Sequence, residues 1–182
     1  NNNIVKGGFK AVAAKDNITA VKIKSSRMLL ATGFLRKVFE IFESYQTPID
    51  MITTSEVGVS MSIDNNSHLD EIVDELKKYG TVTVDTDMCI ICVVGDLDWQ
   101  NRGFEAKAIT ALEDIPVRMI SYGGSNHNIS FLIQEADKKR ALQYGKAFYI
   151  ISRPTGLRLS HSLAISSCSW GPSYPASKSS SL

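Results

Sequence analysis

The chain has 182 residues, of which 43% are hydrophobic, and this is enough for the packed core of one large or two small domains. Lysine and arginine number 20 and acidic residues 19, so the net charge of +1 gives no electrostatic reason to expect nucleic acid or an anionic membrane as a partner. The longest apolar run, 88–94, is far shorter than the ~20 residues of a membrane-spanning helix. We therefore expect a cytoplasmic protein with a small neutral or zwitterionic ligand.

The first half of the chain combines four strand patterns with two helical ones. The strands are predicted at residues 20–24, 49–53, 58–63 and 81–85. Apolar residues at helical spacing predict a helix over 33–45, with Thr32 as its N-cap. A second helix begins after Ser67, which forms a capping box with Asp70, and it ends at Gly80. The resulting order, βαββαβ, is that of the ferredoxin-like fold.

The second half of the chain repeats this plan. Strands are predicted at 88–94, 117–121 and 129–133, and helices at 103–112 and from 135 to about 144. Gly103-Phe104 lies 70 residues after Gly33-Phe34, and each pair opens a helix that leads to a strand. No fourth strand follows, so we expect the apolar segment 9–14 to supply it. The predicted fold class is α+β, with two ferredoxin-like βαββαβ units, the second discontinuous and the first inserted in it.

The three cysteines do not suit a disulfide framework, because their number is small and odd. Cys89 and Cys92 have the spacing of a redox or zinc pair, but they lie in a predicted buried strand, where positions i and i+3 face opposite sides. We therefore predict a structural role for both. His127 lies in a polar turn and has no second ligand at a suitable spacing, so we expect it to form hydrogen bonds rather than to bind a metal.

Two motifs of the chain resemble the regulatory region of aspartate kinases. The first is MLLATGFL at 28–35 followed by IDMITTSEV at 49–57, and the second is VRMISYGGS at 117–125 followed by NHNISF at 126–131. The resemblance implies two tandem ACT domains. In this family such domains sense an end-product amino acid, usually lysine or threonine, and restrain the phosphorylation of aspartate by ATP.

The resemblance also implies domain boundaries. The first, effector-binding ACT domain is assigned to 18–86, and the second to 8–15 together with 87–145. A serine-rich tail at 146–182 departs from the family pattern, and its composition is that of a non-native sequence.

The chain lacks the parts that phosphoryl transfer needs. A glycine-rich phosphate loop with its lysine, and carboxylates that bind metal ions, are not found in a strand-to-helix context. We therefore expect no catalytic residue, no metal ligand and no cofactor in this chain, and we interpret it as a regulatory part separated from its kinase domain. The resemblance implies that the parent kinase would use ATP and Mg²⁺.

Nine positions match the effector-binding motif of the family one by one. They are Met28, Gly33, Phe34, Leu35, Asp50, Thr54, Ser55, Glu56 and Val57. Backbone N–H groups that open a helix at Gly33 suit the carboxylate of an amino acid. Asp50 is the expected acceptor for the α-ammonium group, and Glu56 for the ε-ammonium group of lysine. The effector implied by the match is lysine.

Three further positions differ, either from lysine-sensitive relatives or between the two copies. Ala31 and Pro48 stand where lysine-sensitive relatives often have serines. Arg118 takes the place of Asp50 in the second copy, and a cation there repels an ammonium group. We therefore expect lysine to bind only in the first domain and the second to serve in packing between chains. Edge strands, if unpaired, favour a homodimer through the ACT domains.

Two alternatives stay open at this point. An ACT module of this kind could respond to threonine or S-adenosylmethionine instead of lysine. The chain could also be a small enzyme on a ferredoxin-like frame, because a fold does not determine a function. The only candidates for such chemistry are Cys89, Cys92 and His127, and none of them has an evident partner.

Overall fold

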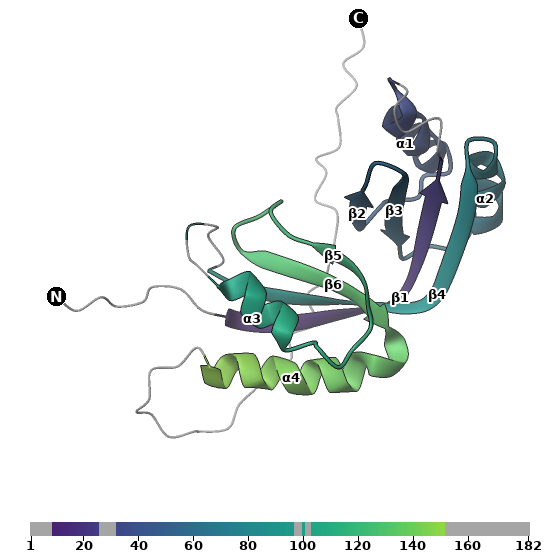
Figure 1. The fold of residues 1–182 in the computed structure, drawn as a ribbon. Helices are drawn as coiled ribbons and strands as arrows, with labels where there is room; N and C mark the ends of the chain where they lie inside the picture. Colours follow the sequence, from purple (N-terminus) through teal and green to yellow (C-terminus); the bar gives the residue numbers. More distant parts are fainter. Residues whose placement is uncertain (1–8, 26–31, 97–99, 101–102, 152–182) are drawn as a thin grey trace, which may run out of the picture.

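The computed structural model describes residues 9–25, 32–96, 100 and 103–151, which form one antiparallel six-stranded sheet with helices (Figure 1). The strands are β1 (Phe9–Lys24), β2 (Met51–Thr54), β3 (Gly58–Ile63), β4 (Thr81–Gly95), β5 (Val117–Ser121) and β6 (Asn128–Gln134), in the order β2-β3-β1-β4-β6-β5. The helices are α1 (Phe34–Ser44), α2 (Leu69–Lys77), α3 (Phe104–Thr110) and α4 (Lys138–Ile151), the last preceded by a short 3-10 turn, η1 (Glu135–Asp137). Within this described part, no helix is both long and apolar enough to cross a membrane.

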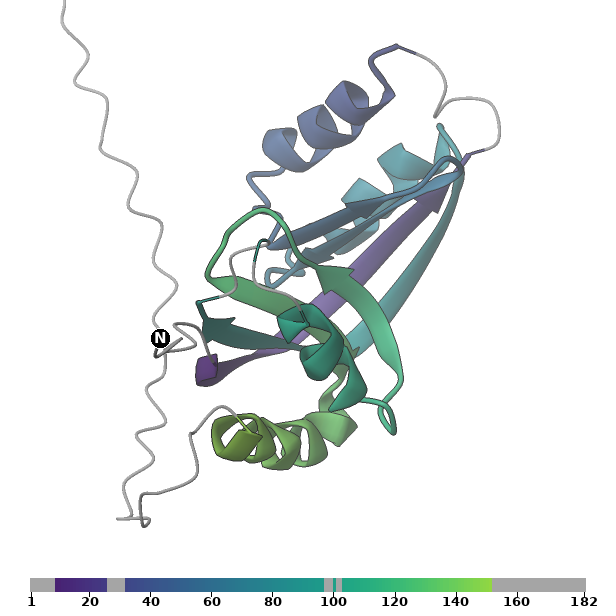
Figure 2. The same cartoon turned by 60° about the vertical axis from the view of Figure 1, so that its left-hand side comes forward.

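Two long strands run through both halves of the sheet, as Figures 1 and 2 show for β1 and β4. The segment 9–15 of β1 pairs with 90–95 of β4, and the segment 20–24 pairs with 81–85. The first half therefore has the strand order β2-β3-β1-β4 and the second half the order β1-β4-β6-β5, which is the same ferredoxin-like arrangement.

Each long strand contains one residue in the left-handed backbone region. Asn17 in β1 and Asp87 in β4 both have φ of 57°, and they lie 70 residues apart in the sequence. Apart from glycine, asparagine and aspartate are the residues that tolerate this conformation best. The pairing register of β1 with β4 shifts between Lys15 and Ile18, next to Asn17. What the sequence suggests as two separate strands is thus one strand with an irregularity.

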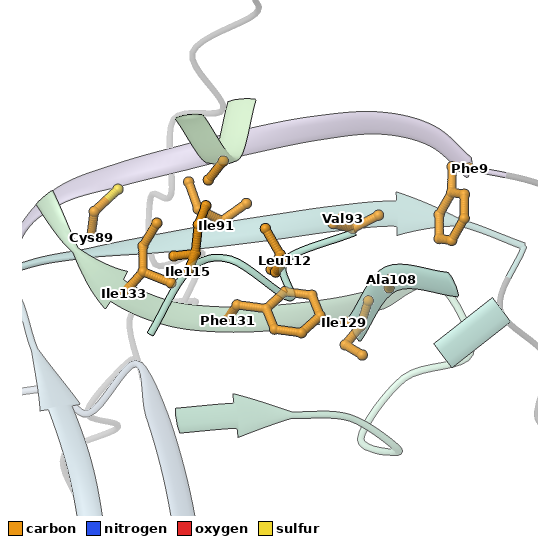
Figure 3. Packing of buried hydrophobic residues seen from close by; sticks show 11 residues of the cluster. Phe9, Cys89, Ile91, Val93, Ala108, Leu112, Ile115, Ile129, Phe131 and Ile133 are labelled. Atoms are coloured by element: carbon orange, nitrogen blue, oxygen red, sulfur yellow. The ribbon is translucent and has the colours of Figure 1, made fainter. Parts of the chain in front are cut away.

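Three clusters of buried residues form the core. The cluster under α1 and α2 contains Val21, Ile23, Phe34, Val38, Ile41, Phe42, Val59, Met61, Ile63, Ile72 and Leu76. The cluster under α3 and α4, drawn in Figure 3, contains Phe9, Cys89, Ile91, Val93, Ala108, Leu112, Ile115, Ile129, Phe131, Ile133 and Ala141. Alternation along the strands places the helices of both halves on the same face of the sheet.

The third cluster lies on the opposite face of the sheet. It contains Ile18, Ala20, Met51, Met88, Ile90, Met119 and Leu132. Met51 comes from β2 and Met119 from β5, which are the two edge strands, and these strands contact each other although they lie at opposite ends of the strand order. The sheet therefore curves so that its helix-free face closes on itself around this cluster.

The predicted helix caps were wrong. The residue before α1 is Gly33, in the left-handed conformation with φ of 93°, and it replaces the expected N-cap Thr32. The residue before α2 is His68, and neither helix start has a side-chain cap. Ser67 instead donates its backbone N–H to Asn65 Oδ1 at 3.0 Å. Local turn hydrogen bonds and a left-handed glycine thus set these helix starts.

The C-terminal helix is longer than the sequence indicated. The pattern suggested an end near residue 144, but α4 continues to Ile151, so 146–151 belong to a helix and not to the tail. The remainder of the predicted tail, 152–182, lies outside the described residues.

The two cysteines of β4 are buried free thiols on opposite faces, as predicted. Cys89 belongs to the helix-side cluster with Ile91, and Cys92 follows three residues later on the other side. Burial raises the pKa of the Cys89 thiol to about 12, and its hydrogen bond to Asp16 Oδ1, at 3.3 Å, acts in the same direction. The protonated thiol of Cys89 is therefore favoured at neutral pH, and this disfavours a nucleophilic role.

An ion pair joins α4 to the middle of β1. Lys138, the first residue of α4, donates to Asp16 Oδ2. The hydrogen bond from Lys138 holds the pKa of Asp16 below its ordinary value, although burial acts in the opposite direction. The same bond raises the pKa of Lys138. The contact therefore favours the folded state while both groups are charged.

We predict that Gly80→Ala destabilises the fold. A Cβ atom at Gly80 would lie 2.5 Å from the Lys24 carbonyl oxygen, and β1 cannot move away without losing its pairing with β4. We expect the free energy of unfolding in urea to fall by about 1–3 kcal/mol. Gly124→Ala is the control, because a Cβ there meets no atom within 4 Å. Equal stability of the two variants would contradict the close approach.

We also predict that Asp16→Asn removes part of the dependence of stability on pH. A carboxyl with a lowered folded pKa stabilises the fold above its ordinary pKa of 3.8, and this stabilisation is lost as the pH falls through the lower folded value. Because the pair is partly exposed, the free energy of unfolding of the parent should exceed that of the variant by only about 0.5–1 kcal/mol at pH 7.

The measurement is urea unfolding at pH 7, 4 and 2.5. The difference in the free energy of unfolding between the parent and Asp16→Asn should shrink at the lowest pH, because protonation of Asp16 removes the charge that distinguishes the two chains. Asp74→Asn, at an exposed pair with Lys77, serves as the control and should change stability little at any of these pH values. A difference that grows on acidification would refute the assigned role of Asp16.

Candidate functional site

The predicted effector positions fall into two places in the structure. Met28 lies outside the described residues. Gly33, Phe34 and Leu35 begin α1, and Thr54 to Val57 form the end of β2 and the turn to β3. The chain that leads into α1 leaves β1 at this same end of the sheet, where Ser25 donates its N–H to the Val57 carbonyl at 3.1 Å. These two groups of residues therefore share one end of the sheet.

Asp50 lies at the other end of β2. It precedes Met51, the first residue of that strand, so roughly 13 Å of extended chain separate it from Thr54 at ~3.3 Å per residue. Within one chain, the structure does not bring Asp50 together with the turn at Thr54.

Three of the predicted residues line a groove on the helix-free face of the sheet. The groove has a volume of about 220 Å³ and is lined by Lys22, Lys24, Thr53, Thr54, Ser55, Val57, Gly58 and Ser60. The turn is held by Ser55, whose N–H donates to the Gly58 carbonyl at 2.8 Å. Two lysines and several hydroxyl groups suit a carboxylate or another polar group. Lys22 and Lys24 were not predicted as site residues, although they are the polar positions of an alternating strand.

The start of α1 offers backbone donors. Gly33 has φ of 93°, and its carbonyl accepts the N–H of Lys37 at 3.1 Å, which closes the first turn of the helix. Phe34 packs into the core, whereas Leu35 is exposed. The first N–H groups of a helix have no carbonyl partner in the preceding turn, so this end can receive a carboxylate. The same left-handed start occurs at Gly103, with φ of 87°, before α3.

Asp50 is held by a lysine of the same chain. Its side chain is 16% exposed, and Lys15 donates to its Oδ1 atom at 2.8 Å. Its other oxygen, Oδ2, is buried and has no hydrogen-bond partner among the described residues. The N–H of Asp50 donates to the Ser62 carbonyl at 2.8 Å, which fixes its backbone beside β3.

Lys15 also reaches a second carboxylate. Its ammonium lies 2.8 Å from Asp64 Oδ2, just after β3. Burial by itself lowers the pKa of Lys15, but the hydrogen bonds to Asp50 and Asp64 outweigh burial and raise the pKa above its ordinary value. Lys15 and Asp64 were missed in the sequence, because they lie 35 and 14 positions from Asp50 with no local pattern to connect them.

A sister ion pair occupies the equivalent place in the second half. Arg118 of β5 donates its Nε–H to Asp85 Oδ2 at 2.8 Å. Asp85 follows Lys15 by 70 residues, which is the spacing of the internal repeat. In the β1–β4 pairing, Lys15 lies opposite Ile90 and Asp85 lies opposite Ala20, and these two partners are also 70 residues apart. The two pairs thus occupy equivalent positions with the charges exchanged.

His127 contributes through its backbone. Its N–H donates to Ser125 Oγ at 3.0 Å, and its carbonyl accepts the N–H of Gly95 at 2.8 Å. These contacts fit the hydrogen-bonding role expected for it in the turn. Across the described residues, no group of three or more histidine, cysteine, aspartate or glutamate side chains is placed to hold a metal ion.

Comparison with known proteins places this arrangement in a family. A family model described as an ACT domain matches residues 91–144. The structure of a candidate C-terminal regulatory domain of aspartate kinase from Porphyromonas gingivalis is 56% identical, with a TM-score of 0.69, and the match covers 76% of this chain and 95% of that one. Escherichia coli aspartokinase III, solved in complex with lysine and aspartate, is 30% identical with a TM-score of 0.71, and the match covers 81% of this chain and 35% of that one.

The chain also matches complete kinases over part of their length. Aspartokinase 1 of Arabidopsis thaliana, a chloroplastic protein, is 33% identical over 151 residues, which are 78% of this chain. The chain spans about a quarter of the length of such relatives, 26% in this case. By contrast, the match covers 95% of the regulatory domain from Porphyromonas gingivalis. The chain therefore belongs to the family of ACT-domain regulatory regions of aspartate kinases.

Proposed function

We propose that this chain binds an end-product amino acid, lysine in the first instance, and through it restrains an aspartate kinase in feedback inhibition. The observation that carries the proposal is the lysine complex of the Escherichia coli enzyme, to which the chain is 30% identical over 81% of its length. Asp50 supplies the half-buried carboxylate that an α-ammonium group needs. The parent protein would be a cytoplasmic kinase that uses ATP and Mg²⁺, whereas this chain carries only the sensing part.

The proposal includes two ACT domains, the first inserted into the second. The boundaries are 18–86 for the first and 8–15 with 87–145 for the second. The pairing of 9–15 with the second half of β4 supports this division, because it supplies the fourth strand that the second unit otherwise lacks. The left-handed glycines Gly33 and Gly103 at equivalent helix starts support it as well.

A homodimer would bring the separated effector residues together. β2 is an edge strand, so its outer backbone edge can pair with another chain. In an antiparallel pairing of β2 with β2 of a second copy, the first residues of one strand face the last residues of the other. Asp50 of one copy would then lie beside Thr54 and Glu56 of its partner. This arrangement accounts for effector positions at opposite ends of one strand.

Threonine is the second candidate effector. The groove beside Thr54 carries Lys22 and Lys24, and these cations disfavour the ε-ammonium group of lysine at that point. A neutral side chain such as that of threonine avoids this repulsion. A calorimetric titration with lysine, threonine, methionine and S-adenosylmethionine separates these possibilities. Absence of binding heat with all four would contradict the proposed function.

We predict that Asp50→Ala weakens lysine binding about tenfold to a hundredfold, because a charge-assisted hydrogen bond to an ammonium group contributes roughly 1.5–3 kcal/mol. The fold should survive, since Lys15 keeps Asp64 as a partner. Arg118→Ala is the matched control, because it removes one member of the sister ion pair and should leave lysine affinity almost unchanged.

Calorimetry measures the binding of both variants, and circular dichroism confirms that both are folded. The assignment of the effector to the first domain fails if Asp50→Ala binds lysine as tightly as the parent while Arg118→Ala does not.

A further inference from the structure

We propose that the ammonium subsite is the cluster of Lys15, Asp50 and Asp64, and that an effector ammonium group binds Asp50 by exchange with Lys15. In this view the chain's own lysine side chain occupies the subsite when no effector is present. Asp64 then serves as the second partner to which Lys15 stays bound during the exchange. The inference rests on the proposed amino-acid-sensing function and assigns roles to two residues outside the family motif.

Access to Asp50 is the first reason. Lys15 holds Oδ1 at 2.8 Å, and Oδ2 is buried without a partner among the described residues. In this arrangement Oδ2 is closed to a ligand and Lys15 already occupies Oδ1. A ligand ammonium group at this carboxylate therefore competes with Lys15 for Oδ1, or requires a rotation of the carboxylate that breaks the contact with Lys15.

The position of Asp64 is the second reason. Its carboxylate is 38% exposed and already lies 2.8 Å from the Lys15 ammonium. Lys15 can therefore leave Asp50 and keep one charged partner, which makes the exchange far less costly than the release of an unpaired buried cation. The long flexible side chain of lysine suits such a movement better than the planar group of arginine does.

The net charge of the cluster is the third reason. One cation and two carboxylates leave one negative charge, so the cluster attracts a further ammonium group. The sister pair of Arg118 and Asp85 is neutral, and its cation stands where the first copy has the carboxylate of Asp50. Of the two, only the cluster in the first copy therefore has the net negative charge that attracts an ammonium group.

The exchange would also connect the effector to the rest of the chain. Lys15 belongs to the segment of β1 that pairs with the second half of β4, whereas Asp50 and Asp64 flank β2 and β3 in the first half. The Lys15–Asp50 contact thus joins the two halves. An effector that binds Asp50 in place of Lys15 removes the Lys15–Asp50 contact. Binding alone would therefore weaken the junction between the two halves.

The test is calorimetric titration of the Lys15→Met chain with lysine. Without its internal competitor, the chain should bind lysine roughly five- to tenfold more tightly than the parent, because the competent fraction of the site rises. Lys10→Met is the matched control, since it removes an exposed cation from the same strand, outside the groove and the Asp50 cluster, and its affinity should stay within about twofold of the parent. If Lys15→Met does not fold, Lys15→Gln replaces it and should change affinity in the same direction.

Asp64→Asn provides an independent arm. It leaves Lys15 with Asp50 as its only charged partner in the cluster, so lysine binding should weaken severalfold in the parent background and much less in the Lys15→Met background. If the parent binds lysine but Lys15→Met binds it no more tightly than Lys10→Met does, the exchange is wrong and the proposed function stands. If the parent binds none of the four compounds tested above, the proposed function and the exchange both fall.

Discussion

The antiparallel pairing of β1 with β4 is the constraint on which the rest of the structure depends. Each strand serves both halves of the sheet, so each half would lack a strand if either were removed. Asn17 and Asp87 allow this sharing, because their left-handed backbone lets one strand pass from the first half into the second without a loop. We infer that the two halves fold as one cooperative unit around this pair of strands.

The same pairing explains why the two halves can differ in chemistry on a common backbone. The helix starts at Gly33 and Gly103 have nearly the same conformation, with φ of 93° and 87°. The difference lies in the charges beside the junction, where Lys15 meets Asp50 and, at the equivalent place, Asp85 meets Arg118. Exchange of the two charges keeps an ion pair at each place. It also puts a cation, Arg118, where the first half has the carboxylate of Asp50.

Periodicity in the sequence predicted nearly every strand and helix, because buried faces repeat at fixed spacing in both. It could not predict that 9–15 and 20–24 form one strand, because Asn17 lies between them and asparagine is typical of turns. The caps failed for a related reason: Thr32 is a favoured N-cap, but the left-handed Gly33 begins the helix instead. Asp50 was found as a charged residue beside an apolar strand, whereas Lys15 and Asp64 are brought to it only by tertiary pairing.

The free energy of the Lys15–Asp50 contact limits the allosteric coupling energy that the proposed exchange can provide. Partly exposed ion pairs contribute about 0.2–1 kcal/mol, and a pair as buried as this one belongs near the upper end of that range. Allosteric coupling energies are typically about 1–3 kcal/mol, so exchange in one chain accounts for less than the usual effect. Two chains joined through β2 would each contribute one exchange across a shared interface. Strong inhibition by this route therefore requires the dimer, in which the two junctions change together.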